Sequence, residues 1–311
     1  MADNNQVQNS GGPIWGRKTF FLNPSFTVLK DTLKVLHEHE FEVYTIANYR
    51  EVKNILAQNK DSILYINIAA QLSMEGWFNF IRSIEQDPAL NTTQVGLISG
   101  TLKPEVKEFL FENLKLPCGI ITVENTVDVV SANIIDVLNA KNAKGRRQYV
   151  RASCLHDKEA NMLWMYQNRM LKFKLIDVSS IGMAAIASPQ IKSIISEKSL
   201  LRDVTLNIGH YQYNVNLVVL AIKPGQDGNV TLVCILGPDT PVSIRDSIRY
   251  YVGDTLQTLM DLSQNNAVND NADYNNSFSY YKDAMHKFTE ERKGFSTQAH
   301  KIASHKGPGA L

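Results

Sequence analysis

Two short segments near the middle of the chain decide its fold: Arg146-Arg147-Gln148-Tyr149-Val150-Arg151 and Asp177-Val178-Ser179-Ser180-Ile181-Gly182. The first is basic and begins a series of strand-like runs, and the second is a polar turn at the end of an apolar run. Upstream of both, strand-like and helix-like patterns alternate, whereas downstream almost every pattern is strand-like until one helix and a polar tail. The segments therefore mark the boundary between two unlike domains.

The upstream part, residues 14–140, alternates short apolar runs with segments of helical periodicity. The intervening segments carry apolar stripes such as Val52, Ile55 and Leu56, and Pro104 stands where a helix would begin. Five strand–helix units predict a doubly wound parallel sheet in flavodoxin-like order, with helices on both faces. The predicted strands are Thr19–Leu22, Glu42–Ile46, Ile63–Ile68, Val95–Ile98 and Gly119–Val123.

The downstream part, residues 148–262, predicts an antiparallel β-barrel, because short strands are separated by turns. An apolar stripe from Ile244 to Leu259 predicts a terminal helix packed against it, and residues 188–199 predict a helical insertion. Residues 141–151 contain five cationic side chains and no acid, and are predicted to form a basic interdomain linker. The predicted strands are Tyr149–Leu155, Asn161–Gln167, Met170–Ile176, Met183–Ala187, Leu201–Asn207, Val215–Lys223 and Val230–Leu236.

Composition argues against several classes of function. A net charge of +1 provides no whole-molecule field for nucleic acid or an anionic membrane. Cys118, Cys154 and Cys234 are odd in number and lie in apolar runs, which indicates buried thiols in a reducing, cytoplasmic setting. His37 and His39 are expected to be solvated, and the histidines show no metal-ligand spacing. No apolar run approaches a membrane span or a signal-peptide core, so we expect no membrane insertion.

Met74-Glu75-Gly76, followed by Trp77-Phe78-Asn79-Phe80-Ile81, resembles the turn after the phosphorylated strand of response-regulator receiver domains. In that family, paired acids hold Mg²⁺, an Asp accepts the phosphoryl group and a Lys pairs with it. Here Asn23, Asn67 and Glu124 stand in the corresponding regions. Phosphoryl transfer then lacks a chemical basis, because no carboxylates neutralise Mg²⁺ and attack phosphorus. The resemblance therefore implies a pseudo-receiver, kept as a scaffold or docking surface.

Arg147-x-x-x-Arg151 followed by Asp177-x-Ser179-x-x-Gly182 resembles the signature of the PilZ domain, the receptor module for cyclic di-GMP. Neither half is specific alone, but together they are a strong signal at the head of an all-β segment with a terminal helix. The resemblance covers roughly Gly145 to Leu262. It implies that cyclic di-GMP, with no other cofactor, is bound by Arg146, Arg147, Arg151, Asp177, Ser179 and Gly182.

The chemistry of these positions fits that ligand. Arginine binds phosphate oxygens or guanine O6 and N7 bidentately, and on an extended segment Arg147 and Arg151 point to the same face. The Asp177 carboxylate accepts from guanine N1–H and N2–H₂, Ser179 supplies a hydroxyl, and Gly182 permits close backbone approach. In the alternative interpretation, Asp177 and Ser179 only cap a turn and Gly182 only permits a bend.

Both ends of the chain are predicted to lack a fixed fold. Residues 1–13 are polar and are predicted to be disordered, and residues 263–311 are predicted to form a flexible tail. Within the tail, Phe278, Tyr281, Met285 and Phe288 recur at helical spacing and predict a short amphipathic helix over 277–290. That helix is expected either to dock on its own chain or to bind a partner.

Together these observations predict a non-enzymatic signalling adaptor. Cyclic di-GMP would order the basic linker, reorient the two domains and change a surface offered to a protein partner, through the receiver-like domain or the tail. The family resemblance implies regulation of motility, adhesion or envelope processes. Two alternatives remain open: a PilZ-fold interaction protein that binds no nucleotide, and a phosphorelay receiver whose output is the barrel. An enzyme is not expected, because no acid–base pair, activated nucleophile or metal cluster stands out.

Overall fold

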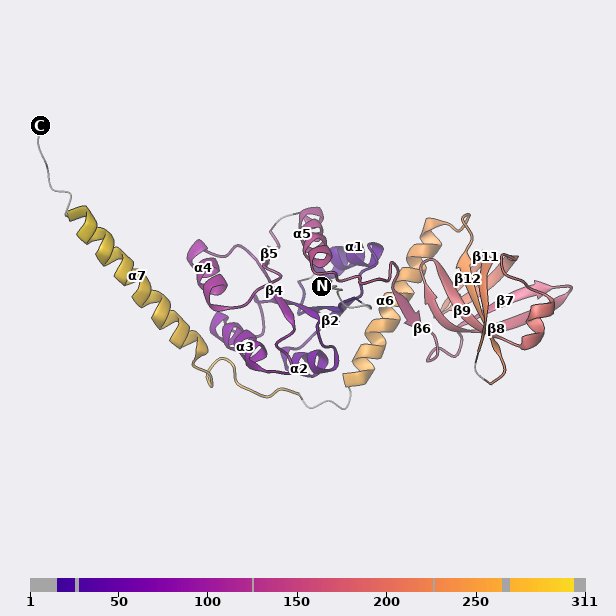
Figure 1. Cartoon of the computed structure of the whole chain (residues 1–311), viewed down its shortest axis with the longest axis horizontal. Coiled ribbons are helices and arrows are strands. Elements are labelled where there is room, and N and C mark those ends of the chain that lie inside the picture. Colours follow the sequence, from indigo (N-terminus) through magenta and orange to yellow (C-terminus); the bar gives the residue numbers. More distant parts are fainter. Residues whose placement is uncertain (1–15, 26–27, 125, 226, 265–268, 305–311) are drawn as a thin grey trace, which may run out of the picture. The chain divides into compact units, whose positions relative to one another are not determined.

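The structure is a computed structural model that describes residues 16–25, 28–124, 126–225, 227–264 and 269–304. The described residues form two compact units, coloured along the sequence in Figure 1. The receiver-like unit contains Thr19–Leu29, Thr45–Val137 and the described chain from residue 269 onward. The barrel unit contains Lys30–Tyr44 and the chain from Leu138 to residue 264, together with the described residues up to Lys18. The predicted disordered N-terminus, residues 1–13, lies outside the described residues.

A parallel sheet forms the centre of the upstream fold. Its strands are β1 (Thr19–Leu22), β2 (Val43–Ile46), β3 (Ile63–Asn67), β4 (Gln94–Ser99) and β5 (Ile120–Thr122). They are hydrogen-bonded in the order β2-β1-β3-β4-β5, which is the flavodoxin-like order. Each strand end lies within one residue of the predicted run. The predicted doubly wound fold is therefore confirmed.

The helices of this fold begin at residues that satisfy their first backbone amides. Helix α2 (Tyr49–Gln58) follows Asn48, whose side chain accepts from the Arg50 amide. Helix α3 (Met74–Gln86) follows Ser73, whose hydroxyl accepts from the Gly76 amide, and α4 (Pro104–Asn113) begins at its predicted proline. The predicted apolar stripes of α2 and α3 are buried: Val52, Ile55, Leu56, Trp77, Phe80, Ile81 and Ile84.

Helix α5 (Val127–Ala140) ends in a hydrogen-bonded turn that carries the chain into the basic segment. Asn142 has a left-handed φ of 53°, and its amide donates to the Asn139 carbonyl. The Ala143 amide donates to the Leu138 carbonyl, so the two bonds form a Schellman cap. Ala143 is buried, and its carbonyl accepts from the Arg17 amide. The start of the predicted linker is therefore an ordered helix cap, not an unburied polar spacer.

The barrel unit is built from antiparallel strands that close on themselves. Its strands are β6 (Arg151–Ser153), β7 (Asn161–Tyr166), β8 (Arg169–Ser179), β9 (Gly182–Ala187), β10 (Leu200–Ile208), β11 (Tyr211–Pro224) and β12 (Val230–Leu236). Across the described residues, β8, β7, β10, β11, β12 and β9 follow one another, and a pairing of β8 with β9 closes the ring. Strand β6 pairs with the end of β8. The predicted antiparallel barrel is confirmed.

Strand β8 is long enough to pair with three neighbouring strands. Its first part pairs with β7 and its last part with β6 and β9, and the β8–β9 register shifts between Leu175 and Asp177. Inward-facing residues of the strands form one core, which also includes Ile248 and Val252 of α6 (Val242–Gln264). Helix α6 therefore packs against the barrel, as predicted.

The predicted helical insertion at residues 188–199 is one short 3₁₀ helix, Pro189–Ser193. Ile191 and Ile195 are buried in the barrel core, and Ile194 packs against it. The apolar spacing of these isoleucines thus reflects anchoring to the core and not a long helix.

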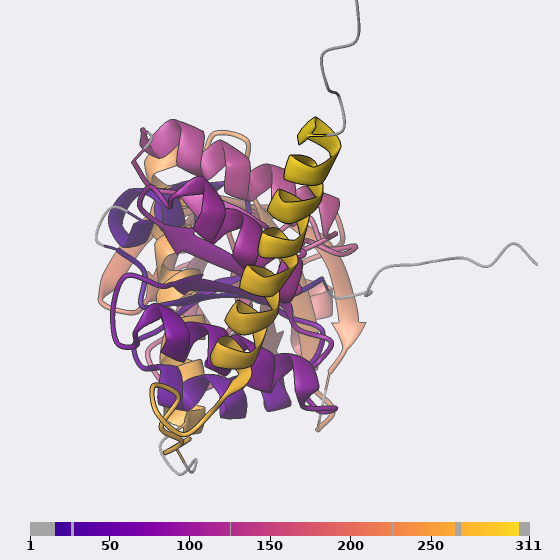
Figure 2. The same cartoon turned by 90° about the vertical axis from the view of Figure 1, so that its left-hand side faces the viewer.

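The C-terminal segment differs most from its prediction. Residues 269–279 lie against the receiver-like unit and Tyr274 is fully buried, so the prediction of a flexible tail is wrong for this segment. Helix α7 (Tyr280–Ser304) is longer than the helix predicted over 277–290, and it lies beside α3 and α4 of the same unit (Figure 2). The low apolar content of the segment misled the prediction, because a few aromatic residues and several polar contacts suffice to hold it.

The three cysteines are buried, as predicted, and none of them forms a disulfide bond. Burial raises the pKa of the Cys154 and Cys234 thiols to about 12, so neither is a thiolate at neutral pH. None of the described helices combines the length and apolar character needed to span a bilayer.

Candidate functional site

The arginines of the basic segment lie on the surface of the barrel unit. Arg146 ends a run of turns after α5, Arg147 follows without regular structure, and Arg151 is the first residue of β6. All three are exposed, Arg151 by half of its side chain. The structure therefore presents these guanidinium groups to solvent at the point where the chain enters the barrel.

Strand pairing brings the two halves of the signature together. Arg151 lies opposite Ser179 in the β6–β8 ladder, and Ser153 lies opposite Asp177. Arg151 Nη1 lies 3.9 Å from Asp177 Oδ1, and 31% of the Asp177 side chain is exposed. A partly exposed pair at this distance contributes little to stability. The exposed fractions of the two side chains leave both groups accessible from solvent.

Ser179 and Gly182 have a different position, inside the turn between β8 and β9. The Ser179 hydroxyl is buried and donates to the Gly182 carbonyl at 3.0 Å. Gly182 lies opposite Ile235 of β12, and a Cβ at this position would collide with the Cys234 carbonyl oxygen. Both residues therefore shape the β8–β9 turn, which follows Asp177 in the chain. Their predicted contacts with a ligand stay predictions.

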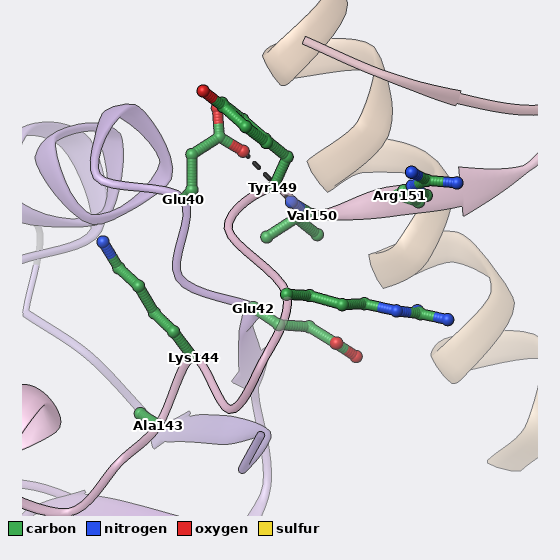
Figure 3. A pocket seen from close by; sticks show the side chains of 8 residues that line it. Glu40, Glu42, Ala143, Lys144, Tyr149, Val150 and Arg151 are labelled. Atoms are coloured by element: carbon green, nitrogen blue, oxygen red, sulfur yellow. Dashed lines mark hydrogen bonds between the residues drawn. The ribbon is translucent and has the colours of Figure 1, made fainter. Parts of the chain in front are cut away.

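A small recess of about 30 Å³ adjoins the basic segment (Figure 3). It is lined by cations and acids: Glu40, Glu42, Lys144, Arg147 and Arg151, with Ala143, Tyr149 and Val150. Arg147 and Arg151 thus line the same recess, as their even spacing predicted, although only Arg151 is in a strand.

Glu40 joins the two segments, and the sequence did not single it out. Its side chain is 9% exposed and accepts three hydrogen bonds. The donors are the Val150 amide at 3.1 Å, the Ser180 hydroxyl at 2.6 Å and Arg249 Nε at 2.8 Å. Val150 lies within the basic segment and Ser180 within the turn, so one carboxylate fixes both halves of the candidate site.

The backbone of Glu40 explains why this residue was missed. It follows α1 (Leu33–Glu38) in a left-handed conformation with φ of 57°, and the amides of Glu40 and Phe41 donate to the His37 and Leu36 carbonyls. Glycine or asparagine is usual at such a helix cap. A glutamate there costs about 1–2 kcal/mol of backbone strain. A strained non-glycine cap is compatible with a required side chain, and here the carboxylate makes the three contacts.

Two arginines of α6 complete this arrangement. Arg245 Nη1 donates to the Ser180 carbonyl at 3.2 Å and its Nη2 donates to the Gly237 carbonyl at 2.9 Å. Burial lowers the pKa of Arg249, but the hydrogen bonds and charges of Glu40 and Asp246 outweigh burial and raise it above its usual value. Ser180 is therefore held from both sides, by Glu40 and by Arg245.

His37 also lies in this region and is only partly exposed, whereas it was expected to be solvated. A Cβ on Gly253 of α6 would collide with its imidazole ring, which shows how closely the two helices pack. Burial lowers the pKa of His37, and the charge of Glu40 raises it by less.

The receiver-like sheet carries amides where phosphorylated receivers carry acids. Asn67 ends β3, its Nδ2 donates to the Asn23 carbonyl at 2.8 Å, and its Oδ1 accepts from the Ala69 amide. Glu124 follows β5 and accepts from the Thr101 hydroxyl and amide, which lower the pKa of this exposed carboxyl. Among the described residues, no group of three or more His, Cys, Asp or Glu side chains is arranged to hold a metal ion.

Comparison with known proteins adds structural likenesses only. No protein-family model matches the chain, and no curated protein matches it. It is similar to the PilZ domain of YcgR from Escherichia coli, solved with c-di-GMP, at 15% identity and a TM-score of 0.34, covering 39% of this chain and 98% of that chain. It is also similar to the chemotaxis response regulator CheY4 of Vibrio cholerae, at 15% identity and a TM-score of 0.33, with the same coverages.

Longer solved proteins are matched over part of their length. The K. pneumonia MrkH–c-di-GMP complex has 15% identity and a TM-score of 0.32, covering 38% of this chain and 55% of that one. The sheet topologies themselves carry the fold assignment: the chain combines a flavodoxin-like parallel sheet with a closed antiparallel barrel and its helix.

Proposed function

We propose that this chain is a non-enzymatic cyclic di-GMP effector whose ligand site consists of the basic segment and Asp177. Arg146, Arg147 and Arg151 contact phosphate and guanine, whereas Ser179 and Gly182 hold the turn that presents Asp177. The observation that carries this proposal is the β6–β8 pairing, which places Arg151 within 3.9 Å of Asp177 although the two are distant in sequence.

The charges of the site match those of the ligand. Cyclic di-GMP carries two phosphodiesters and two guanines, which need forked cationic donors and one carboxylate acceptor. The exposed arginines supply the donors, and Asp177 supplies the acceptor for guanine N1–H and N2–H₂. Adenine presents an acceptor at N1 where guanine presents an N1–H donor. The Asp177 carboxylate would therefore pair with guanine in preference to adenine.

The effector output follows from where the arginines lie. The basic segment continues directly from the cap of α5, so a ligand that orders the arginines also constrains the chain path between the two units. We propose that binding changes the orientation of the units and hence a surface offered to a protein partner. The partner surface belongs to the receiver-like unit or the C-terminal segment, and the setting is the cytoplasm.

Calorimetric titration of the full-length protein with cyclic di-GMP tests the site. Micromolar or tighter binding is expected for the wild type. Loss of one charge-assisted contact in Arg147→Ala costs about 1.5–3 kcal/mol, or roughly 10- to 150-fold in affinity. Arg147→Lys keeps the charge but loses the fork, so its affinity should lie between the two.

The matched control is Arg202→Ala, which removes an exposed arginine from β10 of the same barrel. Its affinity should equal that of the wild type. Absence of binding in the wild type would leave a PilZ-fold interaction protein without nucleotide, and equal affinity in Arg147→Ala and Arg202→Ala would overturn the site. A second titration with cyclic di-AMP should show weaker binding, and Asp177→Asn should narrow that difference.

Fluorescence energy transfer between one dye on each unit tests the output separately. A change in transfer on adding saturating cyclic di-GMP is expected, and it should be absent in Arg147→Ala at the same concentration. Binding without any change in transfer would retain the site and refute the reorientation.

A further inference from the structure

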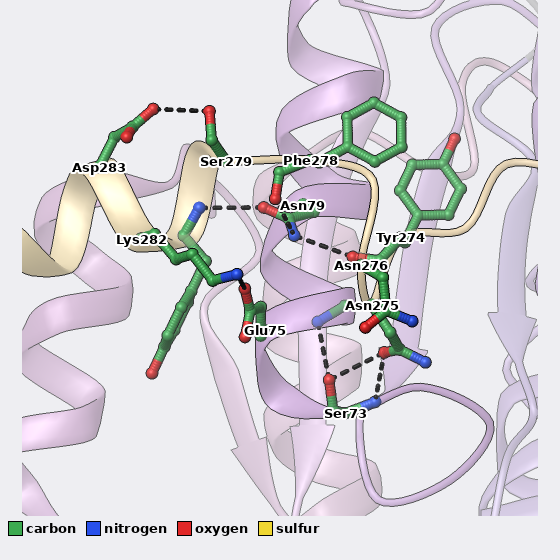
Figure 4. A network of polar contacts seen from close by, with 12 residues as sticks. Ser73, Glu75, Asn79, Tyr274, Asn275, Asn276, Phe278, Ser279, Lys282 and Asp283 are labelled. Atoms are coloured by element: carbon green, nitrogen blue, oxygen red, sulfur yellow. Dashed lines mark hydrogen bonds and ion pairs between the residues drawn. The ribbon is translucent and has the colours of Figure 1, made fainter.

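The C-terminal segment from Asp270 to Arg292 lies on the α2, α3 and α4 side of the receiver-like unit. Figure 4 shows its part from Tyr274 to Asp283 beside Ser73, Glu75 and Asn79. We call this side of the unit the tail seat, defined by Lys53, Ser73, Gly76, Asn79 and Phe109. Lys53, Ser73, Asn79 and Phe109 contact the segment, and Gly76 leaves room for its Asn275 side chain.

Asn79 is the polar centre of the tail seat. It is fully buried on α3, between Phe78 and Phe80. Its Nδ2 donates to the Tyr274 carbonyl at 2.8 Å, and its Oδ1 accepts from the Tyr281 amide at 2.9 Å. A buried amide that bonds the backbone on both sides of a turn recognises the path of that backbone. With the segment removed, these polar atoms of Asn79 would lose their protein partners.

The start of α3 accommodates one side chain of the segment. Asn275 Oδ1 accepts from the Ser73 amide at 3.1 Å and from the Ser73 hydroxyl at 2.8 Å. Gly76 lies one turn further, where a Cβ would collide with the same oxygen. Gly76 is not in a left-handed conformation, so its lack of a side chain serves the approach of Asn275 and not the backbone of α3.

Tyr274 fills the apolar part of the tail seat. Its ring is fully buried, stacks on Phe278 at 4.8 Å and meets Phe80 edge-on at 5.2 Å. Its hydroxyl donates to Asp270 at 2.7 Å, and Asp270 pairs with Lys53 of α2 at 3.3 Å. The hydroxyl and the ring are both satisfied, so a phenylalanine or a leucine would fit less well at this position.

Helix α7 extends the contact along α4. Phe109 lies 5.5 Å from Tyr281 and 5.3 Å from Phe288, each edge-on. Arg292 pairs with Glu108 beyond them. Two residues of the predicted amphipathic stripe, Tyr281 and Phe288, thus face α4, and the exposed side of α7 carries Lys287 and Glu291, which pair with each other.

We propose that the receiver-like unit is a peptide-recognition module whose ligand is the chain's own segment 270–292. Four separate features define the ligand: a carboxylate for Lys53, a buried tyrosine, an asparagine against Gly76, and a helix with aromatic residues toward α4. Intramolecular linkage raises the effective concentration of this ligand, so the seat is filled within one molecule. The segment therefore masks the α3–α4 face, and a protein partner can use either the face or the segment only after the two separate.

The proposal is tested by cutting the connection while leaving both parts present. A site-specific protease sequence is inserted at residues 265–268 of the full-length protein, which is then cleaved. The fragment beginning at residue 269 should co-elute with the remainder on size exclusion at micromolar concentration. Elution of the two parts at their separate volumes would overturn the proposal.

The specificity of the contact is measured by displacement from the cleaved protein. A fluorescent synthetic peptide of residues 269–292 is exchanged into the seat and competed with unlabelled variants, which avoids any effect on folding. Loss of the buried Tyr274 or of the Asn275 hydrogen bonds should weaken competition by about 10- to 100-fold. The matched control Lys287→Ala removes only a solvent-facing charge and should compete like the wild type.

A reciprocal pair of changes separates recognition from general packing. Gly76→Ala in the protein should weaken the wild-type peptide, because the new Cβ displaces Asn275, and alanine is well tolerated within a helix. The peptide with Asn275→Gly should bind both versions of the protein with similar affinity. Equal weakening of both peptides by Gly76→Ala, or equal competition by Tyr274→Ala and Lys287→Ala peptides, would refute a sequence-specific seat.

Discussion

Polar residues near the strand ends differ between the two sheets of this protein: they are bonded to one another in the parallel sheet and exposed beside the barrel. At the edge of the receiver-like sheet, Asn67 bonds to Asn23 and Glu124 bonds to Thr101, so these groups satisfy one another. At the mouth of the barrel, Arg146, Arg147 and Arg151 are exposed, while a separate buried carboxylate, Glu40, holds their backbone. The comparison shows that the polar groups of the parallel sheet are bonded to one another, whereas the cationic groups beside the barrel are exposed to solvent.

Removing the Glu40 carboxylate should cause the largest loss of stability, and it would disturb the barrel side of this contrast. Glu40→Ala leaves Arg249 Nε, the Val150 amide and the Ser180 hydroxyl without their acceptor, although Arg249 Nη1 keeps its bond to Asp246. Breaking a largely buried pair costs about 3–5 kcal/mol, measured as the free energy of unfolding of the barrel unit in urea. The control Glu38→Ala removes an acid of α1 that pairs only at the surface with Lys34, and should change stability by less than about 0.5 kcal/mol. Similar losses in both variants would show that Glu40 is not a central contact.

Filling the space at Gly182 should have the next largest effect. Gly182→Ala places a Cβ against the Cys234 carbonyl and forces β9 away from β12, at a cost of about 1–3 kcal/mol. Gly100→Ala is the control, since a Cβ there meets only an ordinary contact with Glu124. Thermal unfolding should show a lowered Tm for the first variant alone. An unchanged Tm in Gly182→Ala would mean that the glycine serves only the ligand.

Acidification should produce a smaller loss of stability through His37. Burial lowers its pKa in the folded state below the unfolded value, so the unfolded chain binds the proton more readily. Stability is therefore complete above the ordinary histidine pKa and falls as the pH drops below it, by at most about 1.4 kcal/mol per pH unit. His37→Gln should flatten this slope between pH 7.5 and pH 5.5 in urea titrations. An identical slope in both proteins would contradict the assignment to His37.

The smallest expected effect is at the receiver-like edge. Incubation of the wild type with acetyl phosphate and Mg²⁺ should produce no acid-labile phosphate, because Asn67 cannot form an acyl phosphate. Asn67→Asp should also stay unlabelled, since one carboxylate does not replace the paired acids that hold Mg²⁺. Intact-mass measurement detects the adduct directly. A stable adduct on the wild type would show that this edge is a working receiver, and the contrast between the two sheets would fail.

Much of the fold was accessible from local patterns. In the parallel sheet the strand ends agree with the predicted runs to within one residue, because apolar spacing reports directly on which side chains are buried. The stripes of α2 and α3 were identified for the same reason. Pro104 was identified because its fixed φ and missing N–H suit the first position of a helix. In the barrel, the ends of β6, β8 and β11 differ from their predicted runs by up to four residues. The insertion at 188–199 was misjudged, because three isoleucines that anchor a loop to the core have the same spacing as one face of a helix.

The candidate site was accessible only in part. The arginines and Asp177 carry recognisable chemistry at a recognisable spacing, and the structure brings Arg151 and Asp177 together. Ser179 and Gly182 were assigned to the ligand, but their observed contacts are with the chain itself. Local sequence does not distinguish a hydroxyl that faces a ligand from one that closes a turn, since both require the same residue at the same place.

The sequence by itself determined the two fold classes, their order and the chemical character of the basic segment, because these depend on residue types and spacing within short windows. Only the tertiary structure decided that Glu40 holds the segment and the turn together, and that an asparagine-rich tail is seated on α3. Those contacts join residues more than a hundred positions apart, as between Glu40 and Val150 or Asn79 and Tyr274. The physical reason is that a buried polar group is stabilised by partners that only the folded chain brings within hydrogen-bonding distance.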